Sequence, residues 1–177
     1  MLKILHQISD SGLKEKLLKI YEEVKEEFET KPASVKYHHT NKGDMGRHVL
    51  EVMRVALVVY DANPLWYKCS RDDVIVAAFI HDFDKLYRYI PSEEWRQLPK
   101  YGSQMFQYDM AKTRMNDTAE VISFCAHHAL FLSPLLINAV TFHHGGWSVD
   151  AEAGGKAFKP LAVLLHFADM LSYVNDG

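Results

Sequence analysis

The chain has 177 residues, of which 48% are hydrophobic, so it can bury one sizeable core but is short for two domains. We expect a single domain over residues 1–177, with its functional core at about 36–175. The formal net charge is −3, with 20 Lys and Arg against 23 Asp and Glu, which argues against a surface that binds long nucleic acids.

No apolar run approaches the ~20 residues that span a bilayer, and the N-terminus lacks the pattern of a signal peptide. Cys69 and Cys125 do not have the spacing of a metal motif or a disulfide framework. We therefore expect a cytoplasmic protein with reduced thiols and no membrane contact.

Helices are predicted throughout the first half of the chain. Apolar residues recur every three or four positions over residues 11–29, which is typical of an amphipathic helix. Asp44 is a suitable N-cap for the next helix. Ser70 and Asp73 form a capping-box pattern that opens a third helix, which we expect to continue to Lys85.

A looser, aromatic-rich segment is expected to follow as far as about residue 108, because two prolines interrupt it. Three further helices are predicted, over 117–129, from Ser133-Pro134 to Gly145-Gly146, and from Pro160 onward. The last of them is almost wholly apolar. Since no strand alternation competes with these patterns, the sequence predicts a compact all-α fold of about six or seven helices.

Histidine is the unusual feature of the composition. The chain has 10 histidines, and six of them form the doublets His38-His39, His127-His128 and His143-His144. Histidine is the commonest metal ligand among side chains and the usual acid–base group near neutral pH. Whether these histidines form a metal or catalytic site therefore depends on their position relative to buried carboxylates.

Two carboxylates fall where the sequence predicts a core. Asp82 follows His81 at the end of a helix that is apolar on nearly all sides, and Asp169 lies in the apolar last helix without a Lys or Arg on its face. A buried carboxylate without a partner costs several kcal/mol, and a metal cation would satisfy both. His48 lies on an inner helix face. These four residues would suit Mn, Fe, Co, Ni, Zn or Mg better than a soft metal.

The order of these residues resembles the HD-domain superfamily of metal-dependent phosphohydrolases. The matching segments are Gly43-Asp-Met-Gly-Arg-His48, Ala77-Ala-Phe-Ile-His-Asp-Phe-Asp-Lys85 and His166-Phe-Ala-Asp169, which span most of the chain. The resemblance implies an all-α fold with His48, His81, Asp82 and Asp169 as metal ligands. It also implies that the protein can form homo-oligomers.

A second metal ion is an open alternative. In part of that superfamily, extra histidines between the HD pair and the last aspartate hold a second ion, and the HD aspartate bridges the two. His127, His128, His143 and His144 stand at fitting places in this sequence. Alternatively, His143 and His144 only cap the carbonyls at a helix end. Helical phase does not decide which member of each doublet faces the site.

Candidate substrate contacts are Arg47, Lys85 and Arg88, whose positive charges could hold phosphate. Superfamily members that cleave nucleoside monophosphates often have glutamate where this chain has Lys85, which argues against a simple monophosphatase. Aromatic residues surround Arg88 in the segment that ends near residue 108, and could stack on a base or pack against their own domain.

The resemblance implies metal-assisted hydrolysis of a phosphoester or phosphoanhydride. We assign catalytic roles to Asp82, which would orient water, and to Lys85 and His128, which would stabilise charge or protonate the leaving group. A small nucleotide, with a deoxynucleoside triphosphate first, is the expected substrate. The alternatives are a 3′-5′ exonuclease or cyclic-nucleotide phosphodiesterase with two metals, favoured by the lead-in over 32–39, and a non-catalytic nucleotide sensor.

Overall fold

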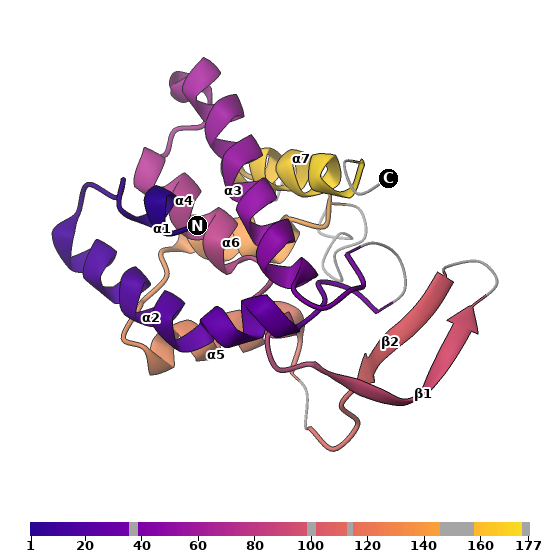
Figure 1. Cartoon of the computed structure of the whole chain (residues 1–177). Coiled ribbons are helices and arrows are strands. Elements are labelled where there is room, and N and C mark those ends of the chain that lie inside the picture. The colour runs from indigo at the N-terminus through magenta and orange to yellow at the C-terminus, as the bar shows by residue number, and fades with distance from the viewer. Residues whose placement is uncertain (36–38, 99–101, 113–114, 146–157, 175–177) are drawn as a thin grey trace.

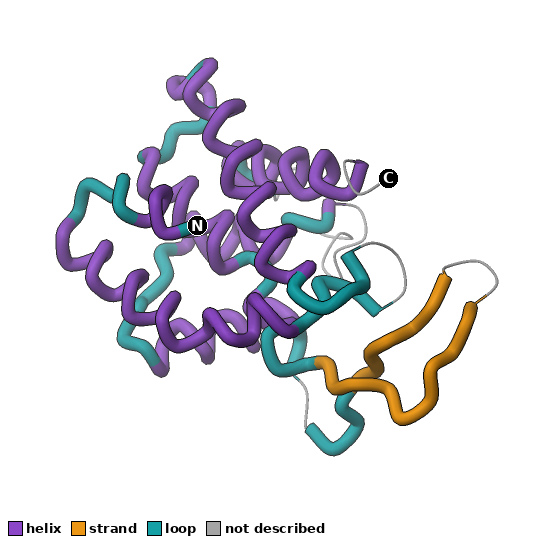
Figure 2. Tube along the Cα trace, viewed as in Figure 1, coloured by secondary structure: helices purple, strands orange, loops and turns teal. Residues whose placement is uncertain are grey.

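The computed structural model describes residues 1–35, 39–98, 102–112, 115–145 and 158–174. Within these residues the chain forms seven α-helices, two 3-10 turns and one two-stranded antiparallel sheet (Figures 1 and 2). The helices are α1 (Leu2–Leu5), α2 (Ser11–Thr30), α3 (Asp44–Ala62), α4 (Arg71–Ile80), α5 (Asp117–His127), α6 (Pro134–Phe142) and α7 (Pro160–Val174). The prediction of a compact all-α fold is confirmed.

Helix α4 lies at the centre of the core. Every residue from Val74 to Ile80 is buried, as its apolar sequence predicts. Helix α3 contacts α4, α2 and α7, and α6 contacts both α4 and α7. Helices α2 and α3 approach closely at Gly46, which has no Cβ atom. A Cβ atom there would lie only 2.9 Å from the carbonyl oxygen of Phe28. The helices therefore bring the ends of α3, α4, α6 and the middle of α7 together inside one core.

Most predicted helix starts are confirmed by the caps. The capping box of Ser70 and Asp73 opens α4, and Ser133 caps α6 with Pro134 in its first turn. Asp44, however, is not the N-cap of α3: Gly43 is, with a φ of 81°. The Asp44 carboxylate instead accepts hydrogen bonds from the backbone and side-chain nitrogens of Asn41, so Asp44 becomes the first helical residue.

Three helix ends come earlier than predicted. Helix α4 stops at Ile80, and Lys85 lies on a separate 3-10 turn, Phe83–Lys85, rather than on the face of α4. Helices α5 and α6 end at His127 and Phe142. Gly145 adopts a φ of 59° in the turn after α6, and its predicted partner Gly146 is outside the described residues.

The segment predicted to be irregular contains a hairpin. Strands β1 (Tyr89–Leu98) and β2 (Gly102–Tyr108) pair antiparallel and project from the helical body (Figure 1). The register is irregular between Pro91 and Arg96, which explains the missing alternation. Tyr89 and Phe106 at the hairpin base pack with Val35 in a small cluster of their own. These contacts join residues far apart in the sequence, so no local sequence pattern predicts them.

Helix α7 is less buried than its sequence suggests. Its inner face, which includes Leu161, Leu165 and Ala168, packs in the core, whereas Val163 and Phe167 are 54% and 48% exposed. Among the described residues, none of the helices is both long enough and apolar enough to cross a bilayer.

Candidate metal centre

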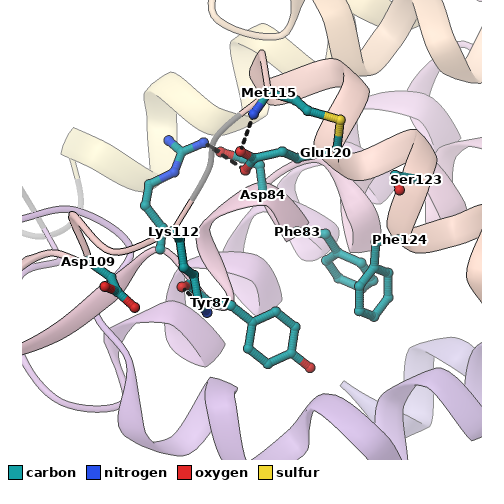
Figure 3. Close-up of a pocket in the computed structure, with 10 residues that line it drawn as sticks. Phe83, Asp84, Tyr87, Asp109, Lys112, Met115, Glu120, Ser123 and Phe124 are labelled. Carbon is teal, nitrogen blue, oxygen red and sulfur yellow. Dashed lines mark hydrogen bonds and ion pairs between the residues drawn. The ribbon is translucent and has the colours of Figure 1, made fainter.

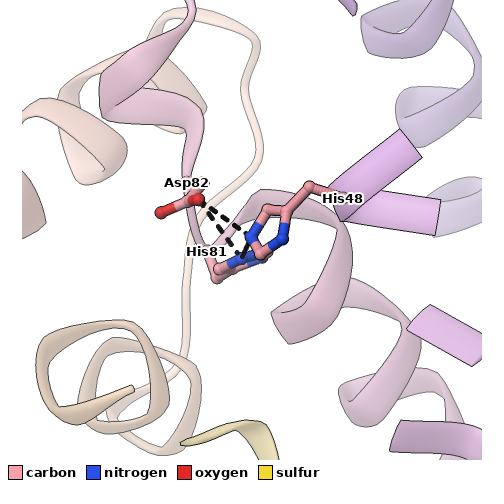
Figure 4. Close-up of side chains that lie close together, drawn as sticks. All are labelled: His48, His81 and Asp82. Atoms are coloured by element: carbon pink, nitrogen blue, oxygen red, sulfur yellow. Dashed lines mark hydrogen bonds and ion pairs between the residues drawn. The ribbon is translucent and has the colours of Figure 1, made fainter. Parts of the chain in front are cut away.

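Three predicted ligands converge where α3 approaches the end of α4 (Figure 4). The Nε2 atom of His48 lies 3.2 Å from Nε2 of His81 and 3.2 Å from Oδ2 of Asp82. The His81 Nε2 atom is 3.5 Å from the same Asp82 oxygen. Ligand atoms about 2.1 Å from a shared cation are separated by about 3.0–3.4 Å at octahedral or tetrahedral angles. The observed spacing fits such a set.

The fourth predicted ligand approaches from α7. Oδ1 of Asp169 lies 3.3 Å from Nε2 of His48, and the Asp169 side chain is 15% exposed. His48, His81 and Asp82 are almost completely buried, so Asp169 lies on the open side of the cluster. Two imidazoles and two carboxylates of this kind suit a borderline or hard divalent cation.

Hydrogen bonds to the rear nitrogens orient the imidazoles. Nδ1 of His81 donates to the carbonyl of Ala78 at 2.8 Å, and Nδ1 of His143 donates to the carbonyl of Val140 at 2.6 Å. With the proton on Nδ1, the Nε2 lone pair of each ring faces the cluster. Metal-binding histidines commonly have this arrangement, because the rear hydrogen bond fixes both tautomer and ring orientation.

His48 is held by Ser172 of α7, a residue that the sequence did not indicate. The Ser172 hydroxyl donates to Oε2 of Glu51 at 3.0 Å, so its oxygen accepts from Nδ1 of His48 at 3.1 Å. His39 stacks behind His48 with ring centroids 5.1 Å apart, and its Nε2 is 3.3 Å from the Ser172 carbonyl oxygen. The only signal in the sequence was a serine three residues after Asp169 within a largely apolar segment.

A second set of donor atoms faces the far side of Asp82. Oδ1 of Asp82 lies 3.5 Å from Nε2 of His143, and both atoms are buried without a hydrogen-bond partner. Nδ1 of His144 lies 3.7 Å from Oδ2 of Asp169. Asp82, His143 and His144 form a group of mutually close donors. Because buried polar atoms normally have partners, this pair of facing atoms fits a second cation.

The structure does not bring His127 or His128 into either set. His128 follows the end of α5, stacks on Phe124 with centroids 4.5 Å apart, and its Nε2 lies 3.4 Å from Oε1 of Glu23 in α2. His127 is exposed. The turn after α5 thus directs both imidazoles away from Asp82, and the geometry gives no support to a catalytic role for His128. His38 of the first doublet lies outside the described residues.

The cluster has strong electrostatic coupling. Burial would lower the pKa of His48, but the carboxylates of Asp169 and Asp82 raise it to about 9. Burial lowers the pKa of His81 to about 3. Although burial opposes ionisation of Asp82, the ammonium of Lys85 and the neighbouring His81 hold its pKa well below the ordinary value. Burial likewise opposes ionisation of Asp169, but His144 and His48 hold its pKa well below the ordinary value. Two ionised carboxylates therefore lie in the cluster, where a cation would neutralise them.

Lys85 is the cation nearest to these carboxylates among the predicted substrate contacts. Its Nζ atom donates to Oδ2 of Asp82 at 2.8 Å, and its side chain is 14% exposed. Burial opposes its charge, yet Asp82 and Asp84 raise its pKa. The 3-10 turn after α4 thus brings Lys85 to Asp82 despite the early end of the helix.

Arg88 and Arg47 have protein partners. The guanidinium of Arg88 forms ion pairs with Asp84 and with Asp117 and Glu120 of α5. Arg47, behind the cluster, donates to Nδ1 of His39 at 3.2 Å. Their substrate contacts stay predictions, although Arg88 also borders a cavity beside the cluster.

A cavity of about 620 Å³ opens beside the cluster. Its wall includes Lys85, His144 and Asp169 together with Tyr89 and Tyr108. A smaller cavity of about 280 Å³ lies among Phe83, Tyr87 and Phe124 (Figure 3) and contains none of the clustered histidines or aspartates. The larger cavity is therefore the one through which a small molecule could reach the candidate metal ligands.

Comparison with known proteins yields one significant match. The chain is 29% identical over 189 aligned residues to the dihydroneopterin 2′,3′-cyclic phosphate phosphodiesterase of Methanocaldococcus jannaschii, which covers 99% of this chain and 69% of that protein. No family model and no solved structure matches the chain. The chain is thus similar, over almost its whole length, to a phosphodiesterase.

Proposed function

We propose that this chain is an HD-type, metal-dependent phosphohydrolase that hydrolyses a small, nucleotide-like 2′,3′-cyclic phosphodiester. The observation that carries the proposal is the position of Asp82 between two groups of histidine donors, with one oxygen directed to each. Similarity to a cyclic phosphate phosphodiesterase supports the reaction class. It favours a phosphodiester over the deoxynucleoside triphosphate that the sequence alone put first.

The residues that would hold one ion are His48, His81, Asp82 and Asp169, and those that would hold a second are Asp82, His143, His144 and Asp169. When bound, divalent cations supply Lewis acidity, which polarises a phosphoryl oxygen and makes water a better nucleophile near neutral pH. The chemistry of the donors suits Mn, Fe, Co, Ni, Zn or Mg. The carboxylates of Asp82 and Asp169 each have one oxygen near the first set and the other oxygen near the second.

The chain's own groups would act on the phosphate as follows. The Lys85 ammonium, fixed against Asp82 at the cavity wall, lowers the energy of negative charge that develops on the phosphoryl oxygens. Asp82 holds Lys85 and orients the attacking water. Water adds to phosphorus and one of the two ester P–O bonds breaks, which leaves a phosphomonoester and a free hydroxyl.

A hydrolysis panel with ³¹P NMR detection tests this proposal. Metal-stripped protein is reloaded separately with Mn, Fe, Co, Ni, Zn or Mg, and incubated with 2′,3′-cyclic and 3′,5′-cyclic nucleotides, deoxynucleoside triphosphates and short oligonucleotides. We expect conversion of a 2′,3′-cyclic phosphate into a monoester, and loss of at least 100-fold in kcat/KM for His81→Ala, in the range that removal of essential electrostatic groups gives.

The matched control is His127→Ala, which removes an exposed histidine outside the cluster. It should retain wild-type activity. Full activity of His81→Ala would refute the metal assignment, and absence of turnover for every phosphoester with each metal would refute the proposed reaction. Release of triphosphate or of 3′-terminal nucleotides as the dominant product would instead support one of the alternative substrates.

A further inference from the structure

Two chemically different kinds of residue line the cavity beside the cluster. Lys85, His144 and Asp169 contribute charged or ionisable groups. Tyr89, Tyr108 and Tyr173 contribute aromatic rings, and Ala33 and Met170 add apolar surface. A volume of about 620 Å³ falls in the range of sites for small ligands, which typically combine aromatic walls with a few polar groups.

The aromatic rings in this wall, those of Tyr89, Tyr108 and Tyr173, come from segments far apart in the sequence. Tyr89 and Tyr108 are opposite residues at the base of the hairpin, with ring centroids 5.4 Å apart and an angle of 59° between the rings. Tyr89 is 3% exposed and packs with Val35 and Phe106. The Lys31 ammonium donates to the Tyr89 carbonyl at 3.0 Å, which ties the hairpin base to the end of α2.

Burial differs among the aromatic residues of this region. Phe83 and Phe106 are buried in hydrophobic clusters, and Tyr87 borders the smaller cavity. By contrast, Tyr108 is 38% exposed and Tyr173, on α7, is 49% exposed, while both border the larger cavity. These two rings thus retain accessible surface in the space next to the candidate metal ligands.

Such a cavity selects for a ligand with two matching parts. Aromatic side chains stack on planar heterocycles, and this stacking depends little on which hydrogen-bonding groups the heterocycle has. The cationic Lys85 and the candidate metal ligands in the same wall favour a phosphate. A ligand with both parts resembles a mononucleotide, in which a sugar or a short polyol joins the ring to the phosphate.

We infer that Tyr108 and Tyr173 form the binding wall for a planar heterocycle, so that the substrate is a single heterocycle linked to a five-membered cyclic phosphate. This inference rests on the proposed function, because that function places the phosphate beside Lys85 and the candidate metal ligands. Tyr89 supports Tyr108 from the hairpin base. These tyrosines determine specificity for the ring, whereas the clustered histidines and aspartates act on the phosphate.

The test compares two substrates with the same reacting group: a nucleoside 2′,3′-cyclic phosphate and glycerol 1,2-cyclic phosphate, which lacks a ring. The measured quantity is the ratio of their kcat/KM values. Tyr108→Ala should lower this ratio about 5- to 150-fold, the effect of losing one stacking contact. Tyr108→Phe keeps the ring and should retain most of the ratio.

Tyr87→Ala is the matched control, because Tyr87 is 39% exposed, close to the 38% of Tyr108, but borders the other cavity. The ratio should not change in this variant. If Tyr108→Ala does not fold, as judged by circular dichroism, Tyr173→Ala provides the same test from the exposed face of α7. An unchanged ratio in the folded variants would overturn the inference and leave the proposed function intact.

If the wild-type protein hydrolyses no phosphoester, the proposed function fails and the inference is tested by binding. Calorimetry then compares a nucleoside 2′-monophosphate with glycerol 2-phosphate on wild-type protein and Tyr108→Ala. A selective loss of nucleotide affinity would support the aromatic wall. Equal affinity of the two proteins for the nucleotide would refute it.

Discussion

Replacing Ser172 with alanine should weaken metal binding without removing any candidate ligand. Ser172 is fully buried, and its hydroxyl links Nδ1 of His48 to the carboxylate of Glu51. In Ser172→Ala, His48 loses the acceptor that orients its ring, and Glu51 loses a donor. The ring can then turn away from the position in which Nε2 faces Asp82.

The magnitude follows from the two hydrogen bonds. Removing one partner of a buried polar group costs about 1–3 kcal/mol, so the free energy of unfolding of the metal-free protein should fall by about that amount. Loss of a group that orients a metal ligand typically lowers metal affinity about 10- to 100-fold. We expect both effects in Ser172→Ala.

Competition with a chromophoric chelator measures the affinity for Mn, Co or Zn, and urea unfolding of chelator-treated protein measures stability. Two serine variants serve as controls. Ser123→Ala changes an exposed residue of α5 and should affect neither quantity. Ser70→Ala removes the cap of α4 and should cost about 1 kcal/mol of stability while metal affinity is retained. Wild-type metal affinity in Ser172→Ala would refute the orienting role of Ser172.

Three further outcomes are expected. Chelation should lower the unfolding free energy by about 3 kcal/mol relative to protein at a metal concentration 100 times Kd. Calorimetric unfolding should show no such loss in Asp82→Asn, because we expect this variant to bind metal poorly. Asp72 accepts hydrogen bonds from Ser9 and Asp10, which outweigh burial and lower its pKa, so its stabilisation is present above pH 3.8 and is lost as the pH falls below that value. Asp72→Asn should therefore destabilise the protein at pH 7 and little at pH 2–3 in urea titrations; an equal effect at both pH values would contradict this. Gly46→Ala should lower the urea midpoint by an amount equivalent to about 1–3 kcal/mol, because its Cβ would overlap the backbone of α2, and an unchanged midpoint would show that the crossing can widen freely.

The first set of candidate ligands could be predicted because two of its members are charged residues within apolar helices, where unpaired charges are rarely found. Asp82 and Asp169 carry charge within apolar sequence, and that conflict is visible without coordinates. The histidine doublets were harder. A difference of two residues in the end of a helix redirects a side chain, so helical phase did not decide which histidine of each doublet faces the site.

Other features depend on contacts between distant segments. Ser172 contacts His48 across 124 positions of sequence, and one serine does not change the hydrophobic periodicity from which helices are predicted. The hairpin likewise depends on pairing Tyr89 with Tyr108 and on packing against Val35. Neither segment shows the alternation that would predict a strand by itself.

The base of the hairpin has a consequence for how such proteins can diverge. The backbone nitrogen of Asp109 donates to the carbonyl of Arg88 at 2.9 Å, so the chain leaves and re-enters the helical body at nearly the same point. An excursion closed in this way can be lengthened, shortened or exchanged while α3, α4 and α7 keep their positions. Related proteins could therefore acquire new substrates by changes within about twenty residues of this hairpin, while the candidate metal centre stays unchanged.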